Sequence, residues 1–169
     1  KGKDSVPWCW RCGTASAKHD LATEGYKETT PTALFMQFPL KDSPNEYFLI
    51  FTTTPWTVPA NVALAVNPNI NYVKVENSGA KYWLAKSRLQ ELEGNHKILD
   101  NKIGSELEGT EYIMPYSDLE MQNKTHHKVV LWDLASEEEG TGIVHIAPGC
   151  GAEDYDLGKK RNLPAISPL

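Results

Sequence analysis

Hydrophobic and polar residues alternate in several short stretches along the chain, in the way that is typical of β-strands. The pattern predicts strands over residues 32–40, 47–53, 70–76, 127–135 and 143–147. The strongest is YFLIFTT, residues 47–53, which is rich in aromatic and β-branched side chains. Turn-forming residues separate the strands, for example in KDSPNE and NPN.

Few stretches favour helices. NSGAK, residues 77–81, predicts a hairpin that leads into YWLA. AKSRLQELEG, residues 85–94, consists mostly of helix formers and ends in glycine. AEDYDLGKKRN, residues 152–162, is acidic at its start and basic at its end, which matches a helix dipole. We therefore expect a mixed α/β, β-rich fold with a β-barrel-like core and small flanking helices.

The size and charge of the chain narrow the classes of function. Its 169 residues suffice for one domain with its own core, and the net charge of −5 argues against autonomous nucleic-acid binding. A domain that receives nucleic acid from a larger parent is still compatible with that charge. The longest apolar run, Tyr47–Phe51, is too short to cross a membrane, so we expect no membrane partner. The chain has no initiator methionine, and we expect it to be a piece of a larger protein.

The three cysteines are an odd number, and two of them lie only three residues apart, which is not a disulfide framework and predicts a reducing, cytoplasmic location. Cys9 and Cys12 form a CxxC motif, whose spacing lets two thiolates bind one side of a zinc ion. A structural site needs four ligands, so the others would lie outside this chain. We rank this half site above a redox role, and an unoccupied structural pair is an equal alternative.

Two motifs carry the candidate chemistry. FTTTPWTVPANVAL, residues 51–64, reads as a strand that ends in a stiff, proline-bounded loop lined with hydroxyls. GTGIVHIAPGCGAEDYD, residues 140–156, is no nucleotide-binding loop, since it lacks GK[ST] and has Asp154 where GxGxxG needs its third glycine. From spacing alone, His145 is more simply a core histidine and Asp154 a helix-dipole partner. No third residue supports a Cys150–His145 thiol hydrolase.

Together, TTTPWTVPAN and GTGIVHIAPGCGAEDYDLGKK closely resemble the editing domain of isoleucyl-tRNA synthetases, the connective peptide 1 insertion of these class I enzymes. Valyl and leucyl relatives typically read TTRPETL or TTRPDTL, whereas this chain has Thr54 before the proline and Trp56 after it. Many relatives carry histidine at Cys150, which weakens any catalytic role there. The resemblance spans residues 1–169 as a single editing domain, with residues 1–20 as a lead-in segment. HIGH and KMSKS are absent, so the chain cannot aminoacylate on its own.

The resemblance implies post-transfer editing, the hydrolysis of the ester in valyl-tRNA(Ile), with isoleucyl-tRNA(Ile) excluded by pocket size. Valyl-adenylate would be a further substrate candidate. The partners of the chain would be the valine-carrying 3′ end of tRNA(Ile) and the rest of the parent synthetase. Editing would need no cofactor, and the isolated domain would be monomeric.

The resemblance also implies roles for individual residues. Thr52, Thr53 and Thr54 would bind the terminal ribose, the ester and the attacking water. In addition, Trp56 would limit the pocket, Asn61 would orient the loop or the terminal nucleotide, Asp154 would bind the α-ammonium group, and His145 would lie against the valine side chain or assist the water. The alternative is a catalytically silent RNA-binding or zinc-knuckle module, which only the CxxC motif and scattered basic clusters favour.

Overall fold

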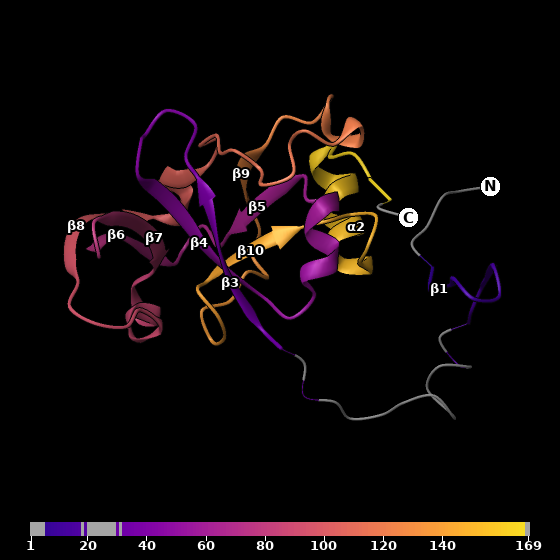
Figure 1. The fold of residues 1–169 in the computed structure, drawn as a ribbon, viewed down its shortest axis with the longest axis horizontal. Helices are drawn as coiled ribbons and strands as arrows, with labels where there is room; N and C mark the ends of the chain where they lie inside the picture. The colour runs from indigo at the N-terminus through magenta and orange to yellow at the C-terminus, as the bar shows by residue number, and fades with distance from the viewer. Residues whose placement is uncertain (1–5, 18, 20–29, 31, 168–169) are drawn as a thin grey trace.

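The computed structural model describes residues 6–17, 19, 30 and 32–167, whose strands form three sheets (Figure 1). The strands are β1 (Trp8–Cys9), β2 (Thr14–Ala15), β3 (Leu34–Pro39), β4 (Glu46–Thr52), β5 (Ala63–Val66), β6 (Asn71–Asn77), β7 (Ala80–Ala85), β8 (Lys97–Ile103), β9 (Lys128–Leu131) and β10 (Ile143–Ile146). The helices are the α-helix α2 (Ala152–Arg161) and the 3-10 helices η1 (Pro55–Ala60), η2 (Lys86–Glu91), η3 (Gly104–Leu107) and η4 (Glu120–Gln122).

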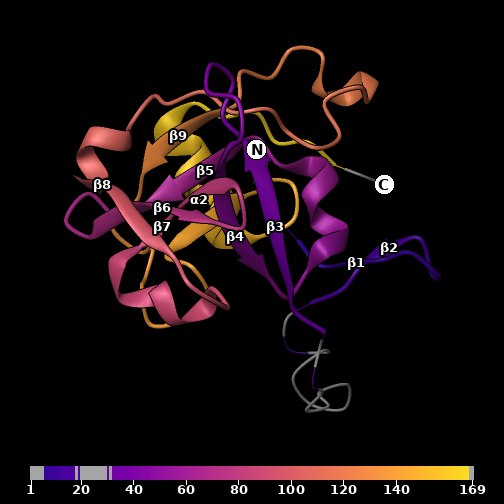
Figure 2. The ribbon, with the colours of Figure 1, turned by 60° about the vertical axis from the view of Figure 1, so that its left-hand side comes forward.

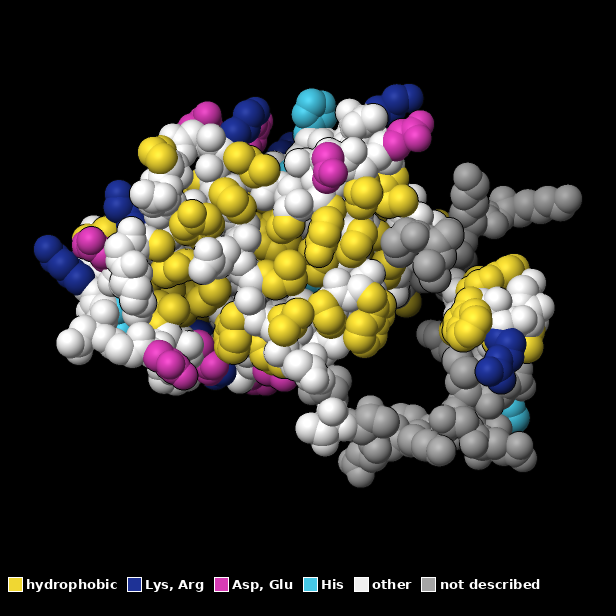
Figure 3. Space-filling model, viewed as in Figure 1, with side chains coloured by type: hydrophobic (Ala, Val, Ile, Leu, Met, Phe, Trp, Pro, Cys, Tyr) yellow, Lys and Arg dark blue, Asp and Glu magenta, His cyan; other side chains and the backbone are white. Residues whose placement is uncertain are grey.

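The largest sheet has five strands in the order β3-β4-β7-β6-β8. The β4–β7 pair is parallel and the other pairs are antiparallel. A tight hairpin joins β6 to β7 through Ser78 (φ 51°) and Gly79 (φ 84°), two left-handed residues that suit the twist of the strands. This confirms the hairpin predicted from NSGAK. Figure 3 shows hydrophobic side chains gathered over the middle of one face. The edge strand β3 exposes Leu34 and Phe35.

The second sheet, in the order β10-β5-β9, lies against the first and shares its core. All four residues of β5 are fully buried because its two faces contact different hydrophobic clusters. Leu64 and Val66 join the core between the sheets, whereas Ala63 and Ala65 pack in the cluster that includes Leu157 of α2. The β1–β2 hairpin stands apart from this body in both ribbon views (Figures 1 and 2).

The β-rich mixed fold predicted from sequence is confirmed, but the sheets of the described residues are open and none closes into a barrel. The strands predicted at 32–40, 47–53, 70–76, 127–135 and 143–147 and the helix at 152–162 all form, some of them shorter. The helix expected over residues 85–94 is instead the short 3-10 helix η2, interrupted by the non-helical backbone of Arg88. Strands β1, β2, β5 and β8 were not predicted. No helix in the described part of the chain is long and apolar enough to cross a bilayer.

Candidate functional site

A pocket of about 650 Å³ lies where the end of β4, strand β10 and the start of α2 meet. Three separate segments supply the residues that line it: Phe51–Thr54 with Trp56 and Thr57; Trp132, Leu134, Ser136 and residues 138–145; and Ala147, Cys150, Gly151, Glu153 and Asp154. The fold therefore brings the threonine motif together with His145 and Asp154, which lie far away in sequence.

Hydrogen bonds hold the threonine loop in one shape. The Thr54 backbone N–H donates to Thr52 Oγ1 at 3.1 Å, and the Thr54 hydroxyl lies 3.4 Å from the hydroxyls of both Thr52 and Thr57. The Thr57 hydroxyl donates to the Thr54 carbonyl at 2.8 Å. Pro55 then starts η1, where its fixed φ favours the first helical turn. The loop thus presents hydroxyls on a rigid backbone, as the sequence motif predicted.

His145 lies on β10 with only 8% of its surface exposed, and its Nε2 is 3.2 Å from Thr57 Oγ1. Because the Thr57 proton goes to the Thr54 carbonyl, its oxygen is free to accept a hydrogen bond from Nε2–H. Nδ1 is buried and has no partner among the described residues. Burial lowers the pKa of His145 to about 4, so the ring is neutral near pH 7. Thr57 was not among the predicted site residues.

Asp154 lies in the first turn of α2 and is anchored by one of its two oxygens. Its Oδ2 accepts a hydrogen bond from the Ala147 backbone N–H at 2.7 Å, whereas Oδ1 has no hydrogen-bond partner in the described part of the chain. Burial raises the pKa of this carboxyl, and the bond from Ala147 lowers it in part. An oriented carboxylate with one open oxygen at a pocket wall is suited to binding a cationic group.

Two other predicted site residues, Trp56 and Asn61, lie at the rim of the pocket and outside it, respectively. Trp56 lines the pocket but is 68% exposed, which places it at the rim. Asn61 does not line the pocket and is fully buried. Its Nδ2 donates to the Ala63 carbonyl at 2.8 Å, and its Oδ1 accepts from the Tyr112 hydroxyl. These bonds fix the path from η1 into β5, which matches loop orientation rather than contact with a nucleotide in the pocket.

The cysteines divide between two places. In the first hairpin, the Cys12 backbone N–H donates to Cys9 Sγ at 3.4 Å, which lowers the pKa of the Cys9 thiol and suits a metal-binding turn. No group of three or more potential metal ligands occurs among the described residues, so zinc remains a prediction. Cys150 lines the pocket, where burial and then the charge of Asp154 raise the pKa of its thiol. That shift disfavours a thiolate nucleophile.

The buried neutral state of His145 makes the stability of the fold pH-dependent. Its pKa is lower in the folded chain than in the unfolded chain, so its contribution is complete above about pH 6.5 and is lost as pH falls toward about 4. We expect this loss to be about 3 kcal/mol of unfolding free energy. Urea unfolding from pH 7 to 4 should show it in the wild type but not in His145→Gln. Parallel pH curves for the two chains would contradict it. Asp154, with a raised pKa, acts in the opposite direction in both chains.

No protein-family profile matches the chain, but individual proteins do. It is 44% identical over 167 residues to the isoleucine--tRNA ligase of Clostridium acetobutylicum, and 40% identical over 184 residues to that of Pyrococcus horikoshii. The alignments cover 99% and 100% of this chain but 16% and 17% of those proteins, so the chain spans about one sixth of their length.

Solved structures with low sequence identity are similar to the chain as well. The GlLeuRS-CP1 crystal structure has a TM-score of 0.65 at 17% identity, covering 76% of this chain and 59% of its own. The P. knowlesi cytosolic leucyl-tRNA synthetase editing domain has a TM-score of 0.60 at 15% identity, covering 77% of this chain and 62% of its own. At these identities, the likeness establishes a shared fold.

Proposed function

Because this chain is homologous along its length to a segment of isoleucyl-tRNA synthetases and has the fold of class I synthetase editing domains, we propose that it proofreads by hydrolysing valyl-tRNA(Ile) and sparing isoleucyl-tRNA(Ile). The observation that carries the proposal is the convergence of the threonine loop, His145 and Asp154 on one pocket. A volume of about 650 Å³ lies in the range of small-molecule sites.

The need for such a site follows from the chemistry of the two amino acids. Valine is one methylene smaller than isoleucine, so a pocket that accepts isoleucine cannot exclude valine by shape. The missing methylene costs only about 1–3 kcal/mol of binding, a limit for which isoleucyl-tRNA synthetase is itself the standard example. A second, smaller site that hydrolyses whatever enters it removes the error.

The reaction is the addition of water to an ester. The water oxygen attacks the carbonyl carbon, the bond from that carbon to the ribose oxygen breaks, and the ribose oxygen takes up a proton. Valine and a free ribose hydroxyl result. An ester is already activated toward water, so hydroxyls that position the water and stabilise the developing oxyanion suffice. Thr52, Thr53 and Thr54 provide these hydroxyls beside the pocket, and Cys150 is not needed as a nucleophile.

Two residues recognise the amino acid. The Asp154 carboxylate pairs with the free α-ammonium group through its open oxygen, which anchors the substrate by its charged end. The neutral ring of His145 packs against the valine side chain and leaves no room for another methylene. Its neutrality matters because a protonated ring would repel the ammonium group. Thr57 holds this ring through its hydrogen bond to Nε2.

A non-hydrolysable valyl-adenosine analogue, with an amide in place of the ester, tests the assignment of the pocket directly. We expect it to bind this chain and to shift the backbone resonances of Thr54, His145 and Asp154 in NMR titration. The isoleucyl analogue should bind at least about tenfold more weakly, because of its additional methylene. Shifts confined to another surface, or equal binding of both analogues, would contradict the proposed pocket.

Substitutions at Thr54 test the threonine loop, because its hydroxyl can be removed without changing the shape of the side chain. Thr54→Val should lower the rate of valine release about five- to tenfold, as expected for one lost hydrogen bond of about 1–1.5 kcal/mol. Thr54→Ser keeps the hydroxyl and should retain most of the rate, but it removes a methyl group and should admit isoleucine more readily. Thr110→Val, outside the pocket, is the control. Unchanged rate and selectivity in both Thr54 variants would show that the threonine loop takes no part in the reaction.

Partners and metal follow as part of the same proposal. The chain spans 16% of its Clostridium relative and carries a net charge of −5, so most contacts to tRNA(Ile) come from the rest of a cytoplasmic synthetase. The N–H to sulfur bond between Cys12 and Cys9 favours zinc in the first hairpin, with its remaining ligands supplied from outside this chain.

A further inference from the structure

The segment of residues 136–142, here called the pocket wall, borders the pocket immediately before β10. Its members Ser136, Glu138, Glu139, Gly140, Thr141 and Gly142 all line the pocket. The pocket wall belongs to none of the strands or helices of the fold, so its position depends on contacts from outside. What holds it therefore also sets the size of the pocket.

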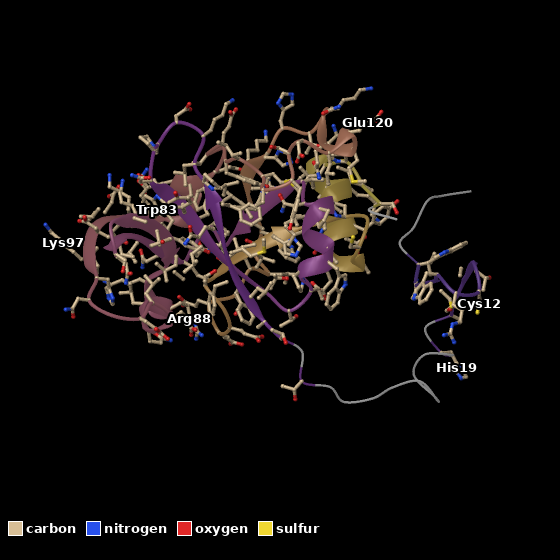
Figure 4. The ribbon with its side chains drawn as sticks, in the orientation of Figure 1. Cys12, His19, Trp83, Arg88, Lys97 and Glu120 are labelled. Atoms are coloured by element: carbon tan, nitrogen blue, oxygen red, sulfur yellow. The ribbon has the colours of Figure 1, made fainter. Side chains whose placement is uncertain are left out.

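One side chain outside the pocket holds the first half of the pocket wall. Arg88 of η2 donates from Nε to the Gly140 carbonyl at 2.8 Å and from Nη1 to the Glu138 carbonyl at 3.2 Å. Its remaining nitrogen, Nη2, pairs with Glu91. The Arg88 side chain is 18% exposed and lies beside the loop that leads into β10 (Figure 4). Arg88 itself does not line the pocket.

The backbone of Arg88 departs from helical geometry. Its φ of −105° and ψ of 17° interrupt the 3-10 helix η2. Neighbouring Ser87 adds a hydrogen bond at 2.6 Å to Glu137, also in the pocket wall. The residue that interrupts η2 is therefore the same residue that donates hydrogen bonds to the pocket wall. A regular helix was predicted over this segment.

The second half of the pocket wall is held by close packing and two further hydrogen bonds. The Ala85 N–H donates to the Thr141 carbonyl and the Tyr72 hydroxyl to the Gly142 carbonyl, both at 2.8 Å. A Cβ added to Gly140 would lie 2.7 Å from Phe51 Cβ, so the backbone there already touches the end of β4. In the described part of the chain, only Arg88 gives side-chain hydrogen bonds to the Glu138 and Gly140 carbonyls.

We infer that Arg88 is a positioning residue that sets the specificity of the pocket by fixing the pocket wall; this role rests on the proposed editing function. The pocket wall is continuous with His145, three residues beyond Gly142. Releasing the carbonyls of Glu138 and Gly140 lets the wall move outward, which makes room for one methylene. The expected consequence is that isoleucyl-tRNA(Ile) is hydrolysed, while the threonine loop and Asp154 keep their places.

The test compares Arg88→Gln and Arg88→Lys with Arg161→Gln. Arg161 is the matched control because it also donates to a backbone carbonyl, that of Leu131 at 2.8 Å, but Leu131 lies outside both the pocket wall and the pocket lining. The first measurement is amide hydrogen exchange in the whole chain. We expect faster exchange over residues 138–142 in Arg88→Gln, an intermediate rate in Arg88→Lys, and the wild-type rate in the control.

The second measurement is the ratio of single-turnover rate constants for valyl- and isoleucyl-tRNA(Ile). We expect this ratio to fall about tenfold in Arg88→Gln, the size of discrimination that one methylene carries. It should recover in part in Arg88→Lys and stay unchanged in Arg161→Gln. A general loss of stability would lower both rate constants and leave their ratio unchanged.

The outcomes separate this inference from the proposed function. Unchanged exchange over residues 138–142 in Arg88→Gln would show that Arg88 does not hold the pocket wall, whatever the rates of hydrolysis. Faster exchange with an unchanged ratio overturns its role in specificity. If the wild type hydrolyses neither ester and also fails to bind the valyl-adenosine analogue, the proposed function fails, and the exchange data still decide whether Arg88 holds the pocket wall. Should Arg88→Gln not fold, Arg88→Lys decides by the same two measurements.

Discussion

Replacing Asp154 with asparagine is expected to slow the release of valine from valyl-tRNA(Ile) by about 30-fold or more while the chain stays folded. The loss follows because the substrate ammonium group would enter the pocket without its counter-charge. Removing one partner of a largely buried charge pair costs about 2–5 kcal/mol, and each 1.36 kcal/mol is tenfold in rate. Single-turnover deacylation at saturating enzyme measures the effect.

Asparagine is chosen because it separates charge from structure. Its amide oxygen can still accept the hydrogen bond from the Ala147 N–H that Asp154 accepts at 2.7 Å, so the turn before α2 keeps its anchor. Asp156→Asn is the control, since Asp156 lies on the same helix but pairs with Lys159 at the surface. A native rate in Asp154→Asn, or an equal loss in both variants, would show that Asp154 does not bind the substrate.

The second large effect is expected for His145→Ala, which should turn a selective pocket into an unselective one. Removing a ring that is 8% exposed leaves space beside the valine side chain, so isoleucine can enter as well. We expect the ratio of valyl to isoleucyl release to fall by about 10- to 100-fold. The lost burial should also lower the unfolding free energy by about 1–3 kcal/mol, so rates are compared well below the melting temperature.

His127→Ala is the matched control for this second effect. His127 is a half-buried histidine whose Nε2 lies 3.0 Å from Gln122 Oε1, and it does not line the pocket. It should lose some stability and keep its selectivity. His145→Gln, with a polar side chain that fills part of the space, should fall between the wild type and His145→Ala. If His145→Ala still spares isoleucyl-tRNA(Ile), the ring does not set the size limit of the pocket.

Much of this site could be predicted from sequence because its chemistry is local in two motifs. TTTPWT specifies a strand end, a proline turn and a row of hydroxyls by itself, and the structure has all three. The first turn of α2 could likewise be predicted, since Glu153 and Asp154 precede three basic residues at its end. The similarity to isoleucyl-tRNA synthetases, which rests on these motifs, is confirmed by the relatives.

What could not be predicted depends on contacts between distant segments. Strand β5 reads ALAV, without alternation, because both of its faces are buried, and periodicity cannot distinguish such a run from a helix or loop. Strand β8 has only one clearly apolar pair and lies at the sheet edge. The roles of Thr57 and Arg88 appear only when partners 88 and about 50 residues away come within hydrogen-bond distance. The only sequence signal for Thr57 was that it is the fourth threonine of the motif.

The account is tested most directly by incubating this chain, at high concentration and low salt, with valyl- and isoleucyl-tRNA(Ile) in parallel. It predicts that valine is released well above the uncatalysed rate while isoleucine stays attached. Equal release of the two amino acids would contradict the selection of valine by pocket size. Release of neither, in a chain that also fails to bind the valyl-adenosine analogue, would contradict the editing function itself.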